Sequence, residues 1–336
     1  MKISTVPDGR LLRICALAAM VSSSLTAHAE PGIEPLPVRE VAAGVFVYQA
    51  PYALAASAND GAIANMGFVV GRDAVAVIDT GNGFRAGARL EAAVRAHTSL
   101  PIRYVVNTHM HPDHVLGNAA FAEAPQAARD PGPAAGQGAQ GARVRFVGHH
   151  KLPRALATRA DTYLAAARRL VGEEAFAGTR IILPDVLVAD KLVLDLGGRR
   201  LELEAWPTAH TDNDLTVRDV ETGTWFLGDL LFIGHVPALD GSIRGWLGLM
   251  RELRTRPAAR VVPGHGPASA PWPEAMEPQM RYLARLEAEV RRLLRLGRTM
   301  AEAAAETGLD ERDGWALFDE FNARNATAAY HELEWE

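Results

Sequence analysis

Short apolar runs alternate with amphipathic segments along the first part of the chain. Three β-type runs, GVFVYQ (44–49), MGFVVG (66–71) and AVAVIDTG (74–81), precede RAGARLEAAVRAH (85–97), whose apolar residues have helical spacing. A short apolar run bounded by turn residues predicts a buried strand, and three- or four-residue apolar spacing predicts an amphipathic helix. The run IRYVVNTH (102–109) then predicts a further strand.

The middle of the chain continues this alternation. HVLGNAAFAEA (114–124) predicts one helix, VRFVGH (144–149) a strand, and LPRALATRADTYLAAARRLVG (152–172) a longer amphipathic helix. Two hairpins are predicted next, KLVLDLGGRRLELEAW (191–206) around Gly197-Gly198 and LTVRDVETGTWFLGD (215–229) around Thr222-Gly223.

The last third is predicted to be mainly helical. WLGLMRELRTR (246–256) and EAMEPQMRYLARLEAEVRRLLRLG (274–297) read as helices, with the strand ARVVPGHG (259–266) between them and short pieces up to Glu336. Two halves that each mix strands and helices predict an α/β sandwich of two sheets covered by helices. Residues 125–141 are rich in Pro, Gly, Ala and Gln without apolar periodicity, which predicts a flexible insertion.

The first 29 residues have the pattern of a cleavable signal peptide. Three basic residues precede the short apolar run ICALAAMV, and Ala27-His28-Ala29 forms an A-x-A cleavage site before Glu30. The apolar run is too short to span a bilayer, and no later segment is long and apolar enough to do so. We therefore expect a periplasmic or secreted protein, in which residues 30–40 form an N-terminal extension.

Composition narrows the chemistry. The chain has 336 residues with 48% apolar and 22% charged residues, typical of a globular protein with a sizeable core. A formal charge of -5 gives no basic footprint for nucleic acid or an anionic membrane, which favours a small, neutral or mildly polar substrate. The one cysteine, Cys15, lies inside the signal peptide. Any metal in the mature protein must therefore be held by histidine and carboxylate.

The segment NTHMHPDHVLGN (107–118) concentrates potential metal ligands. His109 and His111 alternate on an extended segment, so their rings can converge on one point, while Pro112 delays the following helix. Asp113 and His114 then face a neighbouring point. Three histidines with one aspartate in this spacing rarely coincide by chance, so the segment predicts part of a metal site.

Three further ligand-type residues occur where predicted strands end. His210 in WPTAHTDND, Asp229 in TWFLGDLLF and His265 in RVVPGHGP each end an apolar run at a loop. Such loops can present side chains from a rigid scaffold to a shared cleft. Three histidines suit tetrahedral zinc, and a mixed set of histidine and carboxylate suits a second zinc, manganese or iron.

The pattern H-x-H-x-D-H, followed by a lone His, a G-D and a G-H-G, resembles the metallo-β-lactamase superfamily over roughly Val41 to Pro267. The resemblance implies a four-layer αβ/βα sandwich over residues 41–270, with residues 271–336 as a helical extension packed on the same domain. It also implies a dinuclear site, with Zn²⁺ or alternatively iron or manganese. The implied ligands are His109, His111 and His210 for the first metal, Asp113, His114 and His265 for the second, and Asp229 for both.

The flanking segments carry a narrower resemblance. WPTAHTDNDLTV, GDLLFIGHVPALDGSIRGWL and RNATAAYHELEWE are similar to quinoprotein relay system zinc metallohydrolases, which implies a possible quinoprotein dehydrogenase partner. A ligand pattern that includes a bridging aspartate, here Asp229, is more similar to that of glyoxalase II and lactonase-type hydrolases than to that of β-lactamases. Efficient β-lactam hydrolysis is therefore not expected.

The resemblance implies a hydrolase that attacks a small ester, thioester or lactone with a metal-bound hydroxide. Asp113 would orient the hydroxide or shuttle its proton, and His235 would contact substrate or transfer a proton. Asp79 is expected to hydrogen-bond to the loop of His109 and His111. Two other functions stay open, namely a non-haem iron dioxygenase for sulfur species and a non-catalytic accessory that binds a quinoprotein partner or its cofactor.

Overall fold

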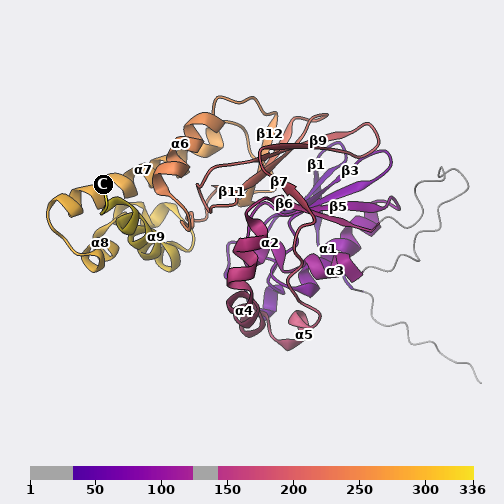
Figure 1. The fold of residues 1–336 in the computed structure, drawn as a ribbon, viewed down its shortest axis with the longest axis horizontal. Helices are drawn as coiled ribbons and strands as arrows, with labels where there is room; N and C mark the ends of the chain where they lie inside the picture. The colour runs from indigo at the N-terminus through magenta and orange to yellow at the C-terminus, as the bar shows by residue number, and fades with distance from the viewer. Residues whose placement is uncertain (1–32, 124–142) are drawn as a thin grey trace, which may run out of the picture. The chain divides into compact units, whose positions relative to one another are not determined.

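Two β-sheets form the centre of the structure, a computed structural model that describes residues 33–123 and 143–336 (Figure 1). The predicted signal peptide with Cys15 and the predicted insertion at 125–141 lie outside the described residues. The first sheet contains seven strands in chain order: β1 (Val38–Ala42), β2 (Val45–Tyr48), β3 (Met66–Val70), β4 (Val75–Ile78), β5 (Ile102–Val106), β6 (Arg145–His149) and β7 (Val186–Val188). Neighbours are antiparallel from β1 to β4 and parallel from β4 to β7.

The second sheet has the strand order β12-β11-β10-β9-β8. Its strands are β8 (Lys191–Asp195), β9 (Arg200–Ala205), β10 (Leu215–Asp219), β11 (Thr224–Phe232) and β12 (Arg260–His265). Strands β8 to β11 pair antiparallel and β12 joins β11 in parallel. Both predicted hairpins are present, and their turn glycines Gly197, Gly198 and Gly223 have positive φ.

The described α-helices lie outside the sheets (Figure 1). They are α1 (Phe84–His97), α2 (Pro112–Val115), α3 (Asn118–Glu123), α4 (Leu152–Val171), α5 (Glu173–Phe176), α6 (Ile243–Leu253), α7 (Glu277–Arg295), α8 (Met300–Glu306) and α9 (Phe318–Leu333). Short 3-10 helices span Ser57–Asn59, Glu274–Met276 and Leu309–Gly314.

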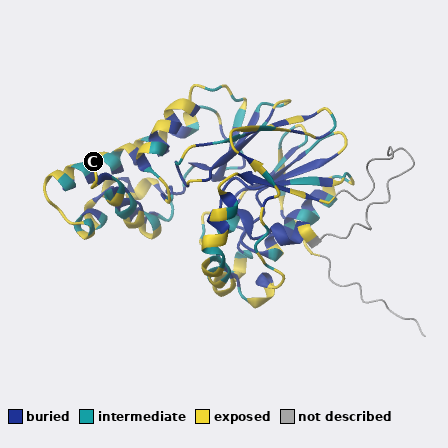
Figure 2. Cartoon of the chain, viewed as in Figure 1, coloured by how far each residue is buried: buried dark blue, intermediate teal, exposed yellow. Residues whose placement is uncertain are grey.

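Most strand residues are buried (Figure 2), and three of the apolar clusters lie between the layers of the sandwich. Side chains of both sheets, such as Ile78 and Leu203, share one cluster between the sheets. Leu90 of α1 belongs to a cluster on the outer face of the first sheet. Tyr282 of α7 packs in a cluster that includes Trp225 of β11. Helix, sheet, sheet and helix layers thus confirm the predicted four-layer sandwich.

Two stretches differ from the elements that the sequence predicts. The single helix expected over 114–124 is divided into α2 and α3, because its backbone bonds to the loop after β4 instead: the carbonyl oxygen of His114 accepts from Thr80 at 3.0 Å, and Gly117 donates to the carbonyl oxygen of Gly81 at 2.9 Å. This close approach also requires glycine, since a Cβ on Gly117 would lie 2.0 Å from the carbonyl oxygen of Thr80. Strand β1 lies partly in the expected N-terminal extension, and the C-terminal "short pieces" include the 16-residue α9.

A buried ion pair connects the sheets. Arg199 and Asp219 form two hydrogen bonds, Nε to Oδ1 at 3.0 Å and Nη2 to Oδ2 at 2.7 Å. The guanidinium also donates to the carbonyl oxygens of Val70 and Ala43 in the first sheet, and Thr222 donates to the carboxylate. Each guanidinium nitrogen and both carboxylate oxygens therefore have partners, so the charges are buried without unsatisfied atoms.

None of the helices in the two described segments is long and apolar enough to cross a membrane.

Candidate metal centre

The segment that carries four of the predicted ligands follows β5, at the carboxyl end of the parallel strands: His109 and His111 lie on the loop, and Asp113 and His114 lie in α2. Asp79, which ends β4 with φ of 56°, accepts hydrogen bonds from the backbone and the hydroxyl of Thr108 at 2.8 and 2.7 Å. Its Oδ2 also lies 2.8 Å from Nδ1 of His114. The buried carboxylate of Asp79 thus fixes the start of the loop and one of its histidines, which is the contact that the sequence predicts.

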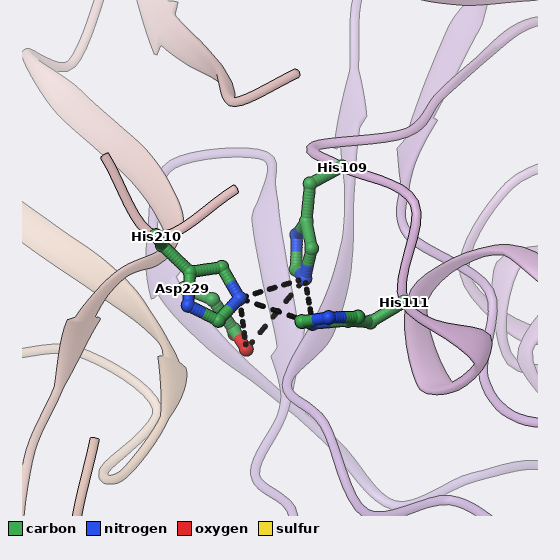
Figure 3. Close-up of side chains that lie close together, drawn as sticks. All are labelled: His109, His111, His210 and Asp229. Atoms are coloured by element: carbon green, nitrogen blue, oxygen red, sulfur yellow. Dashed lines mark hydrogen bonds and ion pairs between the residues drawn. The ribbon is translucent and has the colours of Figure 1, made fainter. Parts of the chain in front are cut away.

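The first group of side chains converges from three elements (Figure 3). Nε2 of His109 lies 3.0 Å from Nδ1 of His111, and Nε2 of His210 lies 3.3 and 3.0 Å from the same two atoms. Oδ2 of Asp229, from β11, lies 3.6 Å from His109 and 3.4 Å from His210. A tetrahedron with centre-to-ligand distances of about 2.0–2.1 Å has edges of roughly 3.3 Å, so this spacing suits a single metal ion.

The second group lies beside the first and shares Asp229. Nε2 of His114 is 3.2 Å from Oδ1 of Asp229, and Nε2 of His265 is 3.5 Å from Oδ2. Oδ2 of Asp113 is 3.4 Å from His265 and 3.8 Å from His114. The seven predicted ligand residues are therefore brought together in two groups, with the carboxylate of Asp229 facing both.

The approach of Asp229 depends on Gly264. A Cβ at position 264 would lie 1.9 Å from Oδ1 of Asp229, so any larger residue would displace the carboxylate. Positions 264 and 229 lie on adjacent parallel strands, β12 and β11. The glycine in the G-H-G segment thus provides space for the shared carboxylate.

Hydrogen bonds on the outer side of two rings set their tautomers. Nδ1 of His210 lies 2.6 Å from the carbonyl oxygen of Ala238, and Nε2 of His111 lies 3.1 Å from a carboxylate oxygen of Asp240. Both oxygens accept, so these nitrogens carry the protons. The nitrogens that face the first group, Nε2 of His210 and Nδ1 of His111, therefore present lone pairs, as metal ligation requires.

Two buried atoms at the junction of the groups have no hydrogen-bond partner. Among the described residues these include Nε2 of His114 and Oδ1 of Asp229, which lie 3.2 Å apart without making a hydrogen bond. When the His114 ring is neutral, Nδ1 donates to Asp79 and Nε2 presents a lone pair to a carboxylate oxygen. Two buried acceptors side by side require a cation between them, which is a proton in the metal-free protein or a bound metal ion. The histidine and carboxylate atoms around this point fit a metal ion.

The surroundings separate the pKa values of the histidines. Burial lowers the pKa of His210 to about 3, against the opposing charge of Asp229, and burial also holds the pKa of His109 well below 6.5. Burial lowers the pKa of His114 and of His265 as well, but neighbouring carboxylates together outweigh burial and raise both pKa values. These are Asp229, Asp79 and Asp113 at His114, and Asp229 and Asp113 at His265. Carboxylates therefore affect the histidine pKa values more strongly in the second group than in the first.

A cavity of about 410 Å³ opens onto both groups. Its lining includes Asp113, Asp229 and His265, together with His235, whose ring centroid is 4.9 Å from that of His265. Burial, followed by the charge of His265, lowers the pKa of His235 to about 4. Nδ1 of His235 donates to the carbonyl oxygen of Val236 at 2.6 Å, so its other nitrogen is an acceptor.

Sequence reasoning missed three polar residues of the cavity. Asp240, on the loop after β11, bonds to His111, while Arg324 and Asn325 come from α9. All three lie in segments quoted for the narrower resemblance, GDLLFIGHVPALDGSIRGWL and RNATAAYHELEWE. No spacing in the sequence places Arg324 and Asn325 at the site, because their positions depend on how α9 packs.

Asn325 holds the loop that orients His210. Its Oδ1 accepts from the backbone of Leu239 at 2.9 Å, and its Nδ2 donates to the carbonyl oxygen of Pro237 at 2.6 Å. The carbonyl between these points, that of Ala238, is the acceptor for Nδ1 of His210. The buried amide of Asn325 thus fixes the backbone on both sides of this acceptor. The C-terminal helix contributes in this way to a predicted ligand.

Two neighbouring groups of histidine and carboxylate side chains beside a cavity fit a metal-dependent enzyme. The family model of the metallo-beta-lactamase superfamily matches residues 59–265, more than half of the chain, and the chain belongs to this superfamily. The predicted superfamily is thereby confirmed. No curated protein matches the sequence. The narrower similarity to quinoprotein relay system hydrolases stays a prediction.

Solved structures agree with the fold. A metallo-beta-lactamase from Pontibacter korlensis aligns with a TM-score of 0.55 and 20% identity, covering 74% of this chain and 99% of its own. The inverting sec-alkylsulfatase Pisa1 from Pseudomonas sp. aligns with a TM-score of 0.65 and 17% identity over 89% of this chain. The alignment spans 50% of the alkylsulfatase. At these identities the similarity shows a shared fold.

Proposed function

We propose that this protein is an exported dinuclear zinc hydrolase that cleaves a small ester, thioester or lactone. The observation that carries this proposal is the pair of converging ligand groups joined by Asp229 and open to a cavity. The unpartnered lone pair of His114 and the free oxygen of Asp229 support metal binding at their junction. Histidine and carboxylate ligands without cysteine suit zinc, and they also accept iron or manganese.

Each group has a defined task in this proposal. His109, His111 and His210 would hold one ion, and Asp113, His114 and His265 the other, with Asp229 in contact with both. Zn²⁺ bound in such a site lowers the pKa of water toward 7 and polarises a carbonyl oxygen. The outer hydrogen bonds from Asp79, Asp240 and Ala238 keep the histidine rings aimed inward.

Two cavity residues would handle protons and substrate. Asp113 lines the cavity and is partly exposed, so its carboxylate can orient a water molecule and accept its proton. His235 is neutral at pH 7 because of its lowered pKa, and its unprotonated nitrogen is an acceptor. We propose that His235 accepts a hydrogen bond or a proton from the substrate side of the cavity.

Elemental analysis of the mature protein, purified from its native compartment without added metal or chelator, tests the proposal first. About two zinc ions per chain would support it. A panel of esters, thioesters and lactones then defines the reaction, with secondary alkyl sulfates included because an alkylsulfatase has the same fold. Two zinc ions without turnover of any substrate would contradict the hydrolase proposal.

The same measurement separates the alternatives. About one iron per chain, with oxygen uptake in the presence of a persulfide, would favour a dioxygenase. Co-purification with a quinoprotein dehydrogenase and no turnover would favour an accessory protein. N-terminal sequencing of the exported protein tests the signal peptide, which we propose is cleaved before Glu30.

A further inference from the structure

The cavity at the metal centre is lined by residues of the ligand groups and by an apolar wall. The ligand residues include Asp113, Asp229 and His265. The apolar wall includes Leu54, which precedes β3, and Phe321 of α9, segments far apart in the sequence. A substrate that places its reacting group at the ligand residues can therefore lay other atoms against apolar side chains.

Arg324 interrupts this apolar wall. It is the one Lys or Arg among the described residues that line the cavity, and it is exposed. Within the described residues it makes no hydrogen bond and no ion pair, whereas Arg281 and Arg285 of the neighbouring α7 both pair with Glu311. The guanidinium of Arg324 is therefore available to a ligand.

The backbone at Arg324 is held in place. The next residue, Asn325, is buried and is bonded to the backbone on both sides of Ala238. Ala238 also lines the cavity, so this anchor lies at the cavity wall. A long side chain on a fixed backbone can reach a ligand at a lower entropic cost than one on a mobile loop.

The acidic residues of the cavity are already engaged. Asp240 lies 3.1 Å from His111 and 3.9 Å from Arg159, while Asp113 and Asp229 face the histidines of the metal centre. None of them pairs with Arg324. The exposed guanidinium of Arg324 thus has no ion-pair partner among the described residues, and its planar fork matches a carboxylate through two parallel hydrogen bonds.

We propose that Arg324 binds a carboxylate on the substrate, away from the bond that is cleaved. The substrate class becomes an acyl compound with an apolar body and a terminal carboxylate, such as a monoester or monothioester of an aliphatic dicarboxylic acid. This inference rests on the proposed hydrolase function. It adds a specificity determinant from the C-terminal helix.

A binding experiment tests this inference without requiring turnover. The probes are monohydroxamates of aliphatic dicarboxylic acids with four to eight carbons, whose hydroxamate binds the metal end, and their counterparts with an amide in place of the far carboxylate. Calorimetry on the metal-loaded protein gives the affinity ratio of each pair. We expect the carboxylate to bind about tenfold to a hundredfold more tightly at the best chain length.

Three variants interpret this ratio. Arg324→Gln should abolish the preference for the carboxylate and leave binding of the amide within about twofold, and Arg324→Lys should retain part of it. Arg292→Gln removes an exposed arginine of α7 outside the cavity and should leave the ratio unchanged. The inference is overturned if the wild type shows no preference at any length, or if Arg324→Gln keeps it. A normal ratio with no turnover of any ester would contradict only the hydrolase function.

Discussion

Two buried clusters of charged groups in this protein differ in one respect. Around Arg199 and Asp219 every guanidinium nitrogen and carboxylate oxygen has a hydrogen-bond partner. Around Asp229, by contrast, a carboxylate oxygen and the Nε2 lone pair of His114 face each other without one. Both clusters are buried, so burial of charge alone does not distinguish them. The unsatisfied acceptors indicate which cluster binds a cation.

The difference predicts opposite consequences for loss of a carboxylate. In the saturated cluster, the removal of one partner leaves a buried charge uncompensated. In the cluster around Asp229, the carboxylate lies beside the nitrogens of four histidines that could bind metal. Loss of this carboxylate would therefore mainly remove a metal ligand. Stability should therefore depend on Asp219, and metal content on Asp229.

The largest effect is expected for Asp229→Ala. Because Asp229 faces both groups, we expect the metal content to fall from about two ions per chain to below one, and hydrolysis to fall more than about a hundredfold. Elemental analysis and turnover of the best substrate measure both. Asp161→Ala, an exposed aspartate of α4, serves as the control. Retention of both metals and full turnover in Asp229→Ala would exclude the assignment of this residue.

Asp219→Ala should mainly affect stability. It leaves the guanidinium of Arg199 buried without its counter-ion, which typically costs about 3–5 kcal/mol. Urea unfolding gives the change, and elemental analysis should show an unchanged metal content. Glu221→Ala, at an exposed position of the same turn, is expected to change stability by less than about 0.5 kcal/mol. Equal losses in the two variants would refute the role of the ion pair.

A smaller effect is expected for Asp79→Asn, which keeps the shape and the positive φ but removes the charge beside Nδ1 of His114. Loss of such an outer partner typically lowers metal affinity by about 10- to 100-fold. Competition with a chelator measures the affinity of each site, and the second group should weaken more than the first. Asp73→Asn, an exposed aspartate nearby in the sequence, should change neither.

The smallest effect concerns pH. Burial raises the pKa of Asp219, but the hydrogen bonds from Arg199 and Thr222, together with the charge of Arg199, outweigh burial, so the folded-state pKa lies below the usual 3.8. The stability that this charge contributes is therefore complete above 3.8 and is lost as the pH falls through the folded-state pKa. The difference in unfolding free energy between wild type and Asp219→Asn, both metal-free, should shrink over that acid range. A difference that grows on acidification would contradict this sign.

Much of the fold was predictable because apolar periodicity and turn residues are local signals. The strands around Gly197-Gly198 and the long helix α4 follow directly from them. The break between α2 and α3 did not, because it results from backbone hydrogen bonds of His114 and Gly117 to Thr80 and Gly81, which are distant in sequence. Helix α9 was also difficult to predict, because its buried face includes polar residues. Asn325, for example, is buried and bonds to Pro237, a residue distant in sequence.

The candidate site divides in the same way. The ligand set was predictable because histidine and aspartate in that spacing are rare, and strand ends at one sheet edge lie together. The places of Asp240, Arg324 and Asn325 depend on packing between the loop after β11 and α9. No local pattern encodes that contact, although it determines the orientation of His210 and the shape of the cavity.

The two hydrogen bonds of Asn325 to the loop after β11 also have a consequence for the order in which the site is assembled during synthesis. The residue lies 60 positions after His265, so a nascent chain presents all seven ligands before the amide that orients His210 has been synthesised. A ribosome-bound intermediate would therefore carry the ligands on an unfinished scaffold, in which wrong coordination is possible. The orientation of His210 is therefore complete only when the C-terminal helix has been made and packed, so a chain truncated before Asn325 should bind metal poorly although all seven ligand residues are present.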